Sequence, residues 1–336
     1  MLGGAIGVLG AAIVPFAAAE VRVAPGLRVE VVVTGITRPV ELAFDASGRL
    51  VVLSHGCCGE AAGELHWVDL AGSFPVDASR VPRVVIPFPD RSRKVPFGSL
   101  AVDPRSGDLF LGEENGNRIY RLTAEHKLAL FAVGLYHLVG GGSLAFDGQG
   151  RLVALDFASS EGRLRSESPL PPVLEWLESE AYDGPLVFRI DPREDLPRPR
   201  RLDLATPLFP KVSARGAARA DLPRFVSVAA SPADEILLLS SLGEVFRLSS
   251  SVGLQFLARL PAGDYHRTHT TVAPDGSVLV AAGFHSRQLY RISPAGTVSV
   301  VASELGDPGG VVVDRAARLY IAETALHRII RVRPAP

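Results

Sequence analysis

The chain repeats one pattern six times: an apolar strand-like run, a turn rich in Asp and Gly, and a second apolar run. The copies are VELAFDASGRLVVL from Val40, GSLAVDPRSGDLFLG from Gly98, GSLAFDGQGRLVALD from Gly142, VSVAASPADEILLLS from Val226, HTTVAPDGSVLVAAG from His269 and GGVVVDRAARLYIAE from Gly309. A repeat of roughly 40 residues built of strands is typical of a β-propeller. The sequence therefore predicts an all-β fold, a six-bladed β-propeller.

Each copy supplies the two inner strands of a blade, and we expect the segments between copies to supply the outer two. Period-2 alternation places those outer strands at 64–70 and 83–88, 117–123 and 127–133, 185–191 and 200–204, 244–250 and 254–260, and 288–293 and 297–303. The last blade has no fourth strand after residues 327–334. Because the apolar run 27–35 has no other partner, we expect it to complete that blade and close the ring.

Two insertions interrupt the period, at residues 157–184 and 205–222, within one propeller domain that spans 27–334. Long loops in compact folds are usually functional or disordered. The first insertion contains Leu174 and Trp176, which have apolar surface to bury. We expect it to cover one mouth of the tunnel, and a mobile surface excursion is the alternative.

Charge and the N-terminus limit the partners. The 336 residues carry 35 Lys and Arg against 36 Asp and Glu, with a net charge of −1 and no basic block. This balance argues against nucleic-acid binding. Residues 1–19 are apolar and end in Ala17, Ala18 and Ala19, which is typical of a signal peptide, although the segment has no Lys or Arg. We expect a periplasmic or secreted monomer with no membrane span after cleavage; a retained anchor is the alternative.

The segments EENGNRIYRL (113–122) and AETALHRIIRV (322–332) resemble the NHL-type propellers, and GFHSRQLYRI (283–292) is a looser copy. More distantly, the chain is similar to the gluconolactonase-type lactonases and the streptogramin lyases, which are also six-bladed. The resemblance to these enzymes implies one divalent metal in the central tunnel. Carboxylate and amide oxygens at the starts of the innermost strands would hold it.

Aligning the six copies tests that implication. The position two residues before the central Ala, Thr or Val of each copy holds Glu41, Ser99, Ser143, Ser227, His269 and Gly310. A hard cation requires several oxygen ligands, and only Glu41 fits well. The alignment therefore argues against a lactonase-like metal site. The serines are expected to pack as small side chains where the strands converge.

The most polar run, AGDYHRTHTT (262–271), contains His266 and His269. Histidine suits proton transfer near neutral pH, so His269, Glu41 and His266 are candidate catalytic residues. Glu41 and His269 would form either a base and its orienting carboxylate or two ligands of a metal. A hydrogen-bonded tunnel histidine is the alternative. Strand geometry does not require His266 and His269 to converge.

The only two cysteines, Cys57 and Cys58, are adjacent within SHGCCGE (54–60). Exported thiols tend to be oxidised, but adjacent Cα atoms lie only about 3.8 Å apart, so a disulfide between them would be strained. A vicinal disulfide at a rigid loop tip is our first interpretation. A soft-metal site with His55 or His66, or two free thiols, are the alternatives.

Carboxylates also end the second strands of three blades: Glu113 with Glu114, Asp156, and Glu323. In a propeller these ends gather on one face. We therefore predict a ligand-binding face made of His55, Cys57, Cys58, Glu114, Asp156, His285 and Glu323.

The function that we predict is an exported NHL-type propeller that binds a small molecule or a protein through one tunnel face. The alternative is a metal-dependent hydrolase or lyase that acts on a lactone-like substrate, with Glu41 and His269 at the metal. The sequence has no G-x-S-x-G nucleophile motif and no phosphate-binding glycine motif. The sequence does not specify whether the chain is an enzyme. It does not specify a cofactor either, and the one divalent metal of the alternative is the single cofactor that we consider.

Overall fold

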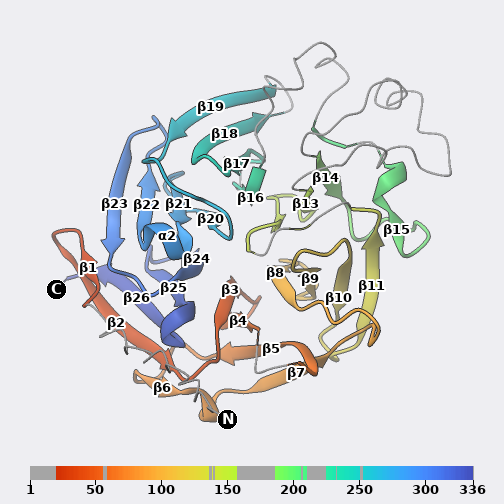
Figure 1. The fold of residues 1–336 in the computed structure, drawn as a ribbon, viewed down its shortest axis with the longest axis horizontal. Coiled ribbons are helices and arrows are strands. Elements are labelled where there is room, and N and C mark those ends of the chain that lie inside the picture. Colours follow the sequence, from red (N-terminus) through yellow and green to blue (C-terminus); the bar gives the residue numbers. More distant parts are fainter. Residues whose placement is uncertain are drawn as a thin grey trace, which may run out of the picture.

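The computed structural model describes residues 20–55, 59–135, 138, 141–156, 186–205, 207–209, 225–231, 233–249 and 253–335. Within these ranges the strands form six sheets that stand around a central axis (Figure 1). In each sheet the strand nearest the axis is the first of its blade. The all-β, six-bladed propeller predicted from the repeat is confirmed.

The strands of each blade pair antiparallel from the axis outward. In blades 1 to 3 they are β3 (Pro39–Phe44), β4 (Leu50–Ser54), β5 (Ala61–Val68) and β7 (Arg83–Pro87); β8 (Phe97–Val102), β9 (Leu109–Glu113), β10 (Ile119–Leu122) and β11 (Leu128–Val133); and β12 (Leu144–Phe146), β13 (Leu152–Asp156) and β14 (Leu186–Ile190). In blades 4 to 6 they are β16 (Phe225–Ala230), β17 (Ile236–Ser240), β18 (Glu244–Ser249) and β19 (Gly253–Arg259); β20 (His269–Val272), β21 (Val278–Ala281), β22 (Leu289–Ile292) and β23 (Val298–Ser303); and β24 (Pro308–Val313), β25 (Leu319–Glu323), β26 (Arg328–Pro334) and β2 (Leu27–Thr34). Short elements lie between them: β1 (Arg22–Val23), β6 (Val76–Asp77), β15 (Arg200–Arg201), the helix α2 (Gly283–Ser286) and the 3-10 helices η1 (Ala78–Arg80), η3 (Leu202–Leu204) and η6 (Thr324–Leu326).

The two faces of the ring differ in what they carry. At one, which we call the turn face, tight turns join the first and second strands of each blade. At the other, the mouth face, the first strand begins beside the end of the second, as Pro39 does beside Ser54 and Pro308 beside Glu323. Residues just before a first strand or just after a second strand therefore meet around the tunnel on the mouth face.

The turns between the first and second strands of blades 1, 3 and 6 are fixed by an aspartate. In blade 3, Asp147 accepts the backbone N–H groups of Gln149 (3.0 Å) and Arg151 (2.9 Å) and the Nε–H of Arg151 (2.8 Å). Asp45 in blade 1 and Asp314 in blade 6 make the same contacts. Asp side chains favour such turns because they bond their own backbone two residues on. The repeated Asp therefore serves the turn.

The ring is closed by strands from opposite ends of the chain. β2 pairs antiparallel with β26 from Leu27 opposite Pro334 to Thr34 opposite Arg328 (Figure 1). Glu30 on β2 strengthens the pairing, because its carboxylate accepts hydrogen bonds from Arg331 (2.6 Å) and Arg333 (3.2 Å). These contacts lower the pKa of Glu30, with the Arg331 hydrogen bond as the largest cause. The predicted closure by the N-terminal strand is confirmed.

The prediction for blade 3 was wrong in one strand. We expected residues 200–204 to form its outermost strand, but among the described residues blade 3 has three strands. Arg200 and Arg201 instead form β15, which pairs in parallel with Ala132 and Val133 of β11 in blade 2. Leu202 then begins a 3-10 helix rather than continuing the strand.

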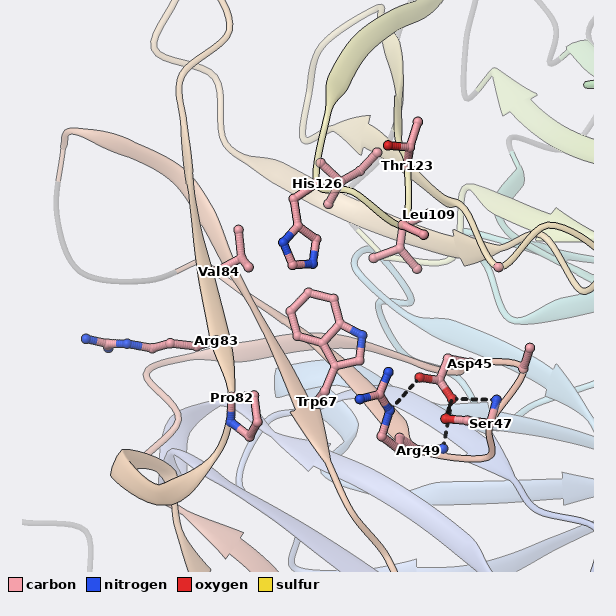
Figure 2. Close-up of a pocket in the computed structure, with 14 residues that line it drawn as sticks. Asp45, Ser47, Arg49, Trp67, Pro82, Arg83, Val84, Leu109, Thr123 and His126 are labelled. Atoms are coloured by element: carbon pink, nitrogen blue, oxygen red, sulfur yellow. Dashed lines mark hydrogen bonds and ion pairs between the residues drawn. The ribbon is translucent and has the colours of Figure 1, made fainter.

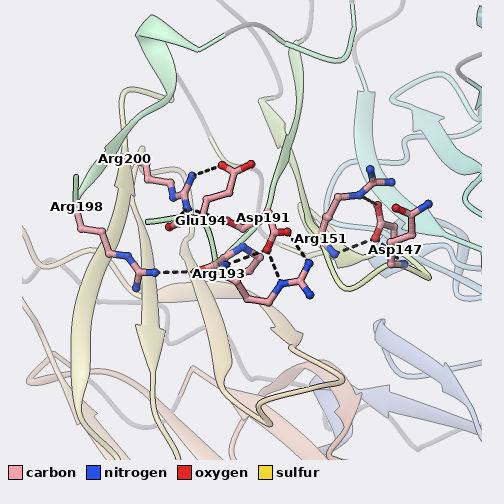
Figure 3. Close-up of polar contacts among 9 residues, drawn as sticks. Asp147, Arg151, Asp191, Arg193, Glu194, Arg198 and Arg200 are labelled. Carbon is pink, nitrogen blue, oxygen red and sulfur yellow. Dashed lines mark hydrogen bonds and ion pairs between the residues drawn. The ribbon is translucent and has the colours of Figure 1, made fainter. Parts of the chain in front are cut away.

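The side chain of Arg200 explains this placement (Figure 3). Its guanidinium donates to the backbone oxygens of Asp191 (2.7 Å) and Glu194 (2.9 Å) and to the Glu194 carboxylate (3.1 Å). It also lies 5.7 Å from the ring centre of Phe131 on β11, within the range of a cation–π contact. The turn after β14 is thus tied to blade 2. Period-2 alternation could not reveal this, because it does not specify the neighbouring strand.

The core lies between adjacent blades. Phe110 on β9 packs edge-on against Phe131 at 4.8 Å in its own blade and against Phe146 of blade 3 at 5.3 Å. Phe110 is fully buried, and burial of such a side chain contributes about 1.5 to 3 kcal/mol. Contacts of this kind fix each blade to the next and so determine where the inner strands meet.

Candidate functional site

The six aligned positions of the inner strands come together at the axis. Glu41 of blade 1 reaches across it: its Oε2 accepts the backbone N–H of Gly142 in blade 3 (2.8 Å), and its Oε1 lies 3.0 Å from Nε2 of His269 in blade 5. Glu41 is fully buried, and His269 is buried as well. The structure therefore brings together the two residues that depart from the ring of Ser and Gly.

Hydrogen bonds fix the protonation pattern of this pair. The backbone N–H of Val311 donates to Nδ1 of His269 (2.9 Å), so Nδ1 carries no proton. The ring proton therefore lies on Nε2, which faces the Glu41 carboxylate. Oε1 of Glu41 also accepts the backbone N–H of Leu42 (3.2 Å). Both nitrogens of His269 and both oxygens of Glu41 thus have a partner, and the pair joins blades 1, 3, 5 and 6.

The remaining axis positions hold small residues, and space explains why. A Cβ on Gly310 would lie 2.6 Å from the backbone nitrogen of Leu42, closer than side chains approach backbone. Ser227 is fully buried and lies 2.7 Å from the hydroxyl of Thr270. These contacts agree with the interpretation of the ring serines as packing residues.

The resemblance to the lactonases and streptogramin lyases implies a divalent metal in the tunnel, and the residues present do not fit one. Glu41 and His269 offer two donors, and three backbone N–H groups already occupy most of their polar atoms. A hard cation requires about six to eight oxygens. In the part of the chain that the structure describes, no three His, Cys, Asp or Glu residues gather as a metal site requires.

A second acid–histidine pair lies at the mouth face. Nε2 of His55, directly after β4, is 2.7 Å from Oε2 of Glu114, directly after β9. At this distance the two side chains form an acid–histidine pair. Oε1 of Glu114 lies 3.2 Å from the Nη2 of Arg267, whose side chain is 66% exposed. Glu114 therefore lies between a histidine and an exposed arginine.

Charge keeps Glu114 ionised despite its burial. Burial raises the pKa of this carboxyl, and it is the largest cause. The hydrogen bond with His55 and the charges of His55, Arg267 and Arg38 together outweigh it, so the pKa lies below its ordinary value of 4.5. A buried carboxylate that stays charged because of its neighbours is typical of binding sites as well as of structural ion pairs.

A cavity of about 60 Å³ opens here on the mouth face. It is lined by Arg38, Val40, His55, Gly98, Glu114, Gly141, Arg267, His269, Asp307, Gly309 and Thr324. A larger space of about 460 Å³, lined mainly by apolar residues of the inner strands, opens on the turn face. His269 lines both, so the Glu41–His269 pair separates the mouth cavity from the turn-face cavity.

His266 does not join either pair. Its Nδ1 lies 2.5 Å from Oδ1 of Asp264, and both side chains are about half exposed on the segment before β20. His269 points to the axis while His266 stays in the loop. The two histidines of this run therefore do not form one site.

The carboxylates that end the second strands are buried rather than exposed on the face. Glu323 accepts the backbone N–H of Gly306 (2.8 Å) and the Nε–H of Arg328 (2.5 Å). Glu113 lies 3.2 Å from Arg93 and accepts the hydroxyl of Tyr120 (3.4 Å). Asp156 is fully buried at the end of β13. Glu323 and Glu113 thus hold the loops around the mouth in place.

Other predicted features lie wholly or partly outside the described residues. These are Cys57 and Cys58, the segment 1–19 and nearly all of the two insertions at 157–184 and 205–222. The predictions for them stay predictions. His285 belongs to α2, which follows β21 on the mouth face; its Gly283 lies beside the backbone of Arg267. Among the described residues, no helix is both long and apolar enough to cross a membrane.

Two arginines of the mouth were not among the predicted site residues. Arg38 precedes the first repeat and adopts a positive φ of 48°, with its backbone N–H bonded to Nδ1 of His327 (2.9 Å). Arg267 stands between the two histidines of the polar run. A search of the two residues before each inner strand would have found both, because those positions face the mouth.

Comparison with known proteins supports the fold. No family model and no curated protein sequence matches the chain. The chain is similar to solved structures of a gluconolactonase from Xanthomonas campestris (17% identity, 94% of this chain and 91% of that one, TM-score 0.56) and of a Trichoderma reesei protein of Carbohydrate-Active Enzymes Family AA12 (11%, 94% and 98%, 0.58).

It is also similar to a catalytically inactive virginiamycin B lyase from Staphylococcus aureus with quinupristin (12% identity, 94% of this chain and all of that one, TM-score 0.55). At these identities the likeness establishes a shared fold. The predicted resemblance to gluconolactonase-like and streptogramin-lyase propellers is confirmed at that level. The assignment to the NHL type stays a prediction.

Proposed function

We propose that this chain is an exported ligand-binding propeller that receives a small polar molecule at the tunnel mouth. The observation that carries the proposal is the Glu114 carboxylate, buried and ionised between His55 and the exposed Arg267 beside a small cavity. Export rests on the apolar segment 1–19, and the NHL-type assignment rests on the repeat motifs.

The chemistry of the mouth favours a ligand with a carboxylate or carbonyl oxygen. Arg267 contacts Glu114 through one terminal nitrogen and keeps most of its surface in solvent, so further N–H donors remain for a ligand. Arg38 lines the same cavity. Guanidinium groups bind carboxylates with paired, directional hydrogen bonds. Glu114 and His55 would hold Arg267 in place and meet the hydroxyl groups of a ligand.

Sugar acids combine a carboxylate with hydroxyl groups, and gluconolactonases are among the structures similar to this chain. Gluconate is therefore the first probe, with binding to residues 20–336 measured by isothermal titration calorimetry. We expect Arg267→Gln and Glu114→Gln to weaken binding about tenfold or more. The first variant removes the guanidinium that meets the carboxylate of gluconate, and the second removes the carboxylate that holds Arg267 in place. Arg259→Gln is the matched control, since Arg259 is 67% exposed and pairs with Glu244 away from the mouth. Equal affinity for gluconate in all three variants would exclude this mouth as the binding site.

The second candidate is a hydrolase or lyase that opens a lactone-like ring at the same mouth. His55 beside Glu114 favours it, since a carboxylate next to a histidine can orient a general base. We expect such an enzyme to acidify a solution of δ-gluconolactone faster than the uncatalysed reaction and to lose that activity in His55→Ala. Metal analysis of the purified protein tests the metal-dependent form. Gluconate binding without turnover of δ-gluconolactone would exclude the enzyme and support the ligand-binding function.

A further inference from the structure

A second concave site lies on the turn face, between blades 1 and 2 (Figure 2). This groove has a volume of about 390 Å³, within the usual range of small-molecule sites. Its walls come from the turn after β3, from β5 and β7, and from the turn between β10 and β11. The groove is therefore separate from the tunnel mouth, which opens on the opposite face.

An aromatic platform forms one wall. Trp67 on β5 is partly buried against the core between blades 1 and 2, with part of its indole left at the groove. His126 lies over it with ring centres 5.5 Å apart and planes tilted by 36° (Figure 2). His126 is exposed and adopts a positive φ of 60° in the turn between β10 and β11. Indole faces bind flat or puckered rings through stacking and C–H contacts.

One arginine supplies the charge of the groove. The Nε of Arg49 donates to Asp45 (2.8 Å), which fixes the direction of the guanidinium beside Trp67 (Figure 2). Its two terminal nitrogens have no partner among the described residues, and the side chain is half exposed. Arg83 contributes to the wall of the groove, but its guanidinium points away from Trp67 (Figure 2) and lies 3.8 Å from Glu64. The groove thus offers the free terminal nitrogens of Arg49 beside an aromatic surface.

We propose that this groove binds a six-membered ring that carries a carboxylate. The ring packs against the part of Trp67 that lines the groove beside His126, and the carboxylate meets the terminal nitrogens of Arg49, as the fork of a guanidinium allows. A uronic acid and an aromatic carboxylic acid share this chemistry. The neighbouring Thr123 and Ser47 hydroxyls at the rim suit the hydroxyl groups of a sugar.

The two tryptophans of the chain make the test direct, because Trp176→Phe leaves Trp67 as the sole indole reporter. The fluorescence of this variant is titrated with glucuronate and with benzoate. Saturable quenching by glucuronate identifies a uronic acid, and quenching by benzoate identifies an aromatic acid. We expect Arg49→Gln to weaken that response about tenfold or more, and Arg83→Gln, whose guanidinium points away from the groove, is the matched control that should leave it unchanged.

Two control ligands separate the parts of the proposal. Glucose has the ring without the charge, and gluconate has the carboxylate without the ring. If glucose or gluconate quenched the fluorescence as strongly as glucuronate or benzoate, the proposal would be overturned. It would also be overturned if neither glucuronate nor benzoate gave saturable quenching. Glu114→Gln should leave the Trp67 response intact, so failure at the tunnel mouth and failure at this groove are distinguishable.

Discussion

The two acid–histidine pairs of this propeller look alike in composition and differ in what surrounds them. Glu41 and His269 lie at the axis, where backbone N–H groups of three blades take up their remaining polar atoms. His55 and Glu114 lie at the mouth, where the remaining partner is an arginine side chain that is mostly in solvent. The axis pair is enclosed by the fold, and the mouth pair stays open to one side.

The difference shows how the same residue types serve structure in one place and binding in another. Backbone donors are fixed by the sheets, so the Glu41 carboxylate cannot exchange them for a ligand without opening the ring. Arg267 can move, because its side chain is long and exposed. A ligand can therefore compete for Arg267 but not for the partners of Glu41. Three changes test this contrast, from the largest expected effect to the smallest.

Glu41→Leu should cause the largest loss of stability. It leaves Nε2 of His269 and the backbone N–H of Gly142 buried without an acceptor, and loss of one partner from a buried pair costs about 3 to 5 kcal/mol. Urea denaturation followed by circular dichroism measures the free energy of unfolding. The control is Glu235→Leu, a half-exposed carboxylate 3.5 Å from Arg247, which should change stability by less than about 1 kcal/mol. Similar losses in the two variants would contradict the structural role of Glu41.

Glu114→Gln should have a smaller effect that depends on pH. The folded pKa of Glu114 lies below 4.5, so its charge stabilises the fold at higher pH. That contribution is lost as the pH falls from 4.5 through the folded pKa. The difference in unfolding free energy between the wild type and the variant should therefore shrink as the pH falls below 4.5.

His66 provides an internal check on that titration. Burial lowers the pKa of this histidine from 6.5, although Glu64 opposes the shift. The unfolded chain then takes up a proton that the folded chain does not, so stability falls as the pH drops below 6.5. Because both the wild type and Glu114→Gln contain His66, this loss cancels in their difference. A difference that stayed the same below pH 4.5 would contradict the assignment to Glu114.

Arg267→Gln should have the smallest effect on stability, below about 1 kcal/mol, because exposed ion pairs contribute little. Its thermal midpoint should match that of Arg259→Gln within about 2 °C. If Arg267→Gln instead destabilised the protein as much as Glu41→Leu, the mouth pair would be as structural as the axis pair. The contrast between the two pairs would then disappear.

The sequence predicted the propeller because the signal is repeated: six copies of one strand–turn–strand pattern leave few alternatives. It also singled out Glu41 and His269, which stand out only when the copies are aligned. The fourth strand of blade 3 was predicted wrongly, since the contact of Arg200 with Phe131 depends on two blades being adjacent in space. Alternation of apolar residues contains no information on that adjacency.

The mouth site shows a second limit of prediction from the sequence, which again concerns residues that become neighbours only in space. His55, Glu114 and Arg267 belong to blades 1 and 2 and to the loop before blade 5, separated by up to about 200 residues, and each is an ordinary polar loop residue in sequence. Two of the three, His55 and Glu114, were placed on the correct face by strand counting. Their contact depends on the diameter of the ring, which is set by side-chain packing between the inner strands.

The pairing of β2 with β26 also has a consequence for folding. The hydrogen bond between Glu30 and Arg331 joins residues 301 positions apart, so the entropy of a very long loop is lost when this sheet forms. During synthesis β2 leaves the ribosome before the other strands of the six blades, and its partner β26 is the last strand to be synthesised. Until then blade 6 exposes an open edge, and contacts this distant in sequence form slowly. Closure of the ring should therefore be a late step, and a chain that stops before β26 should leave β2 free to pair with another molecule.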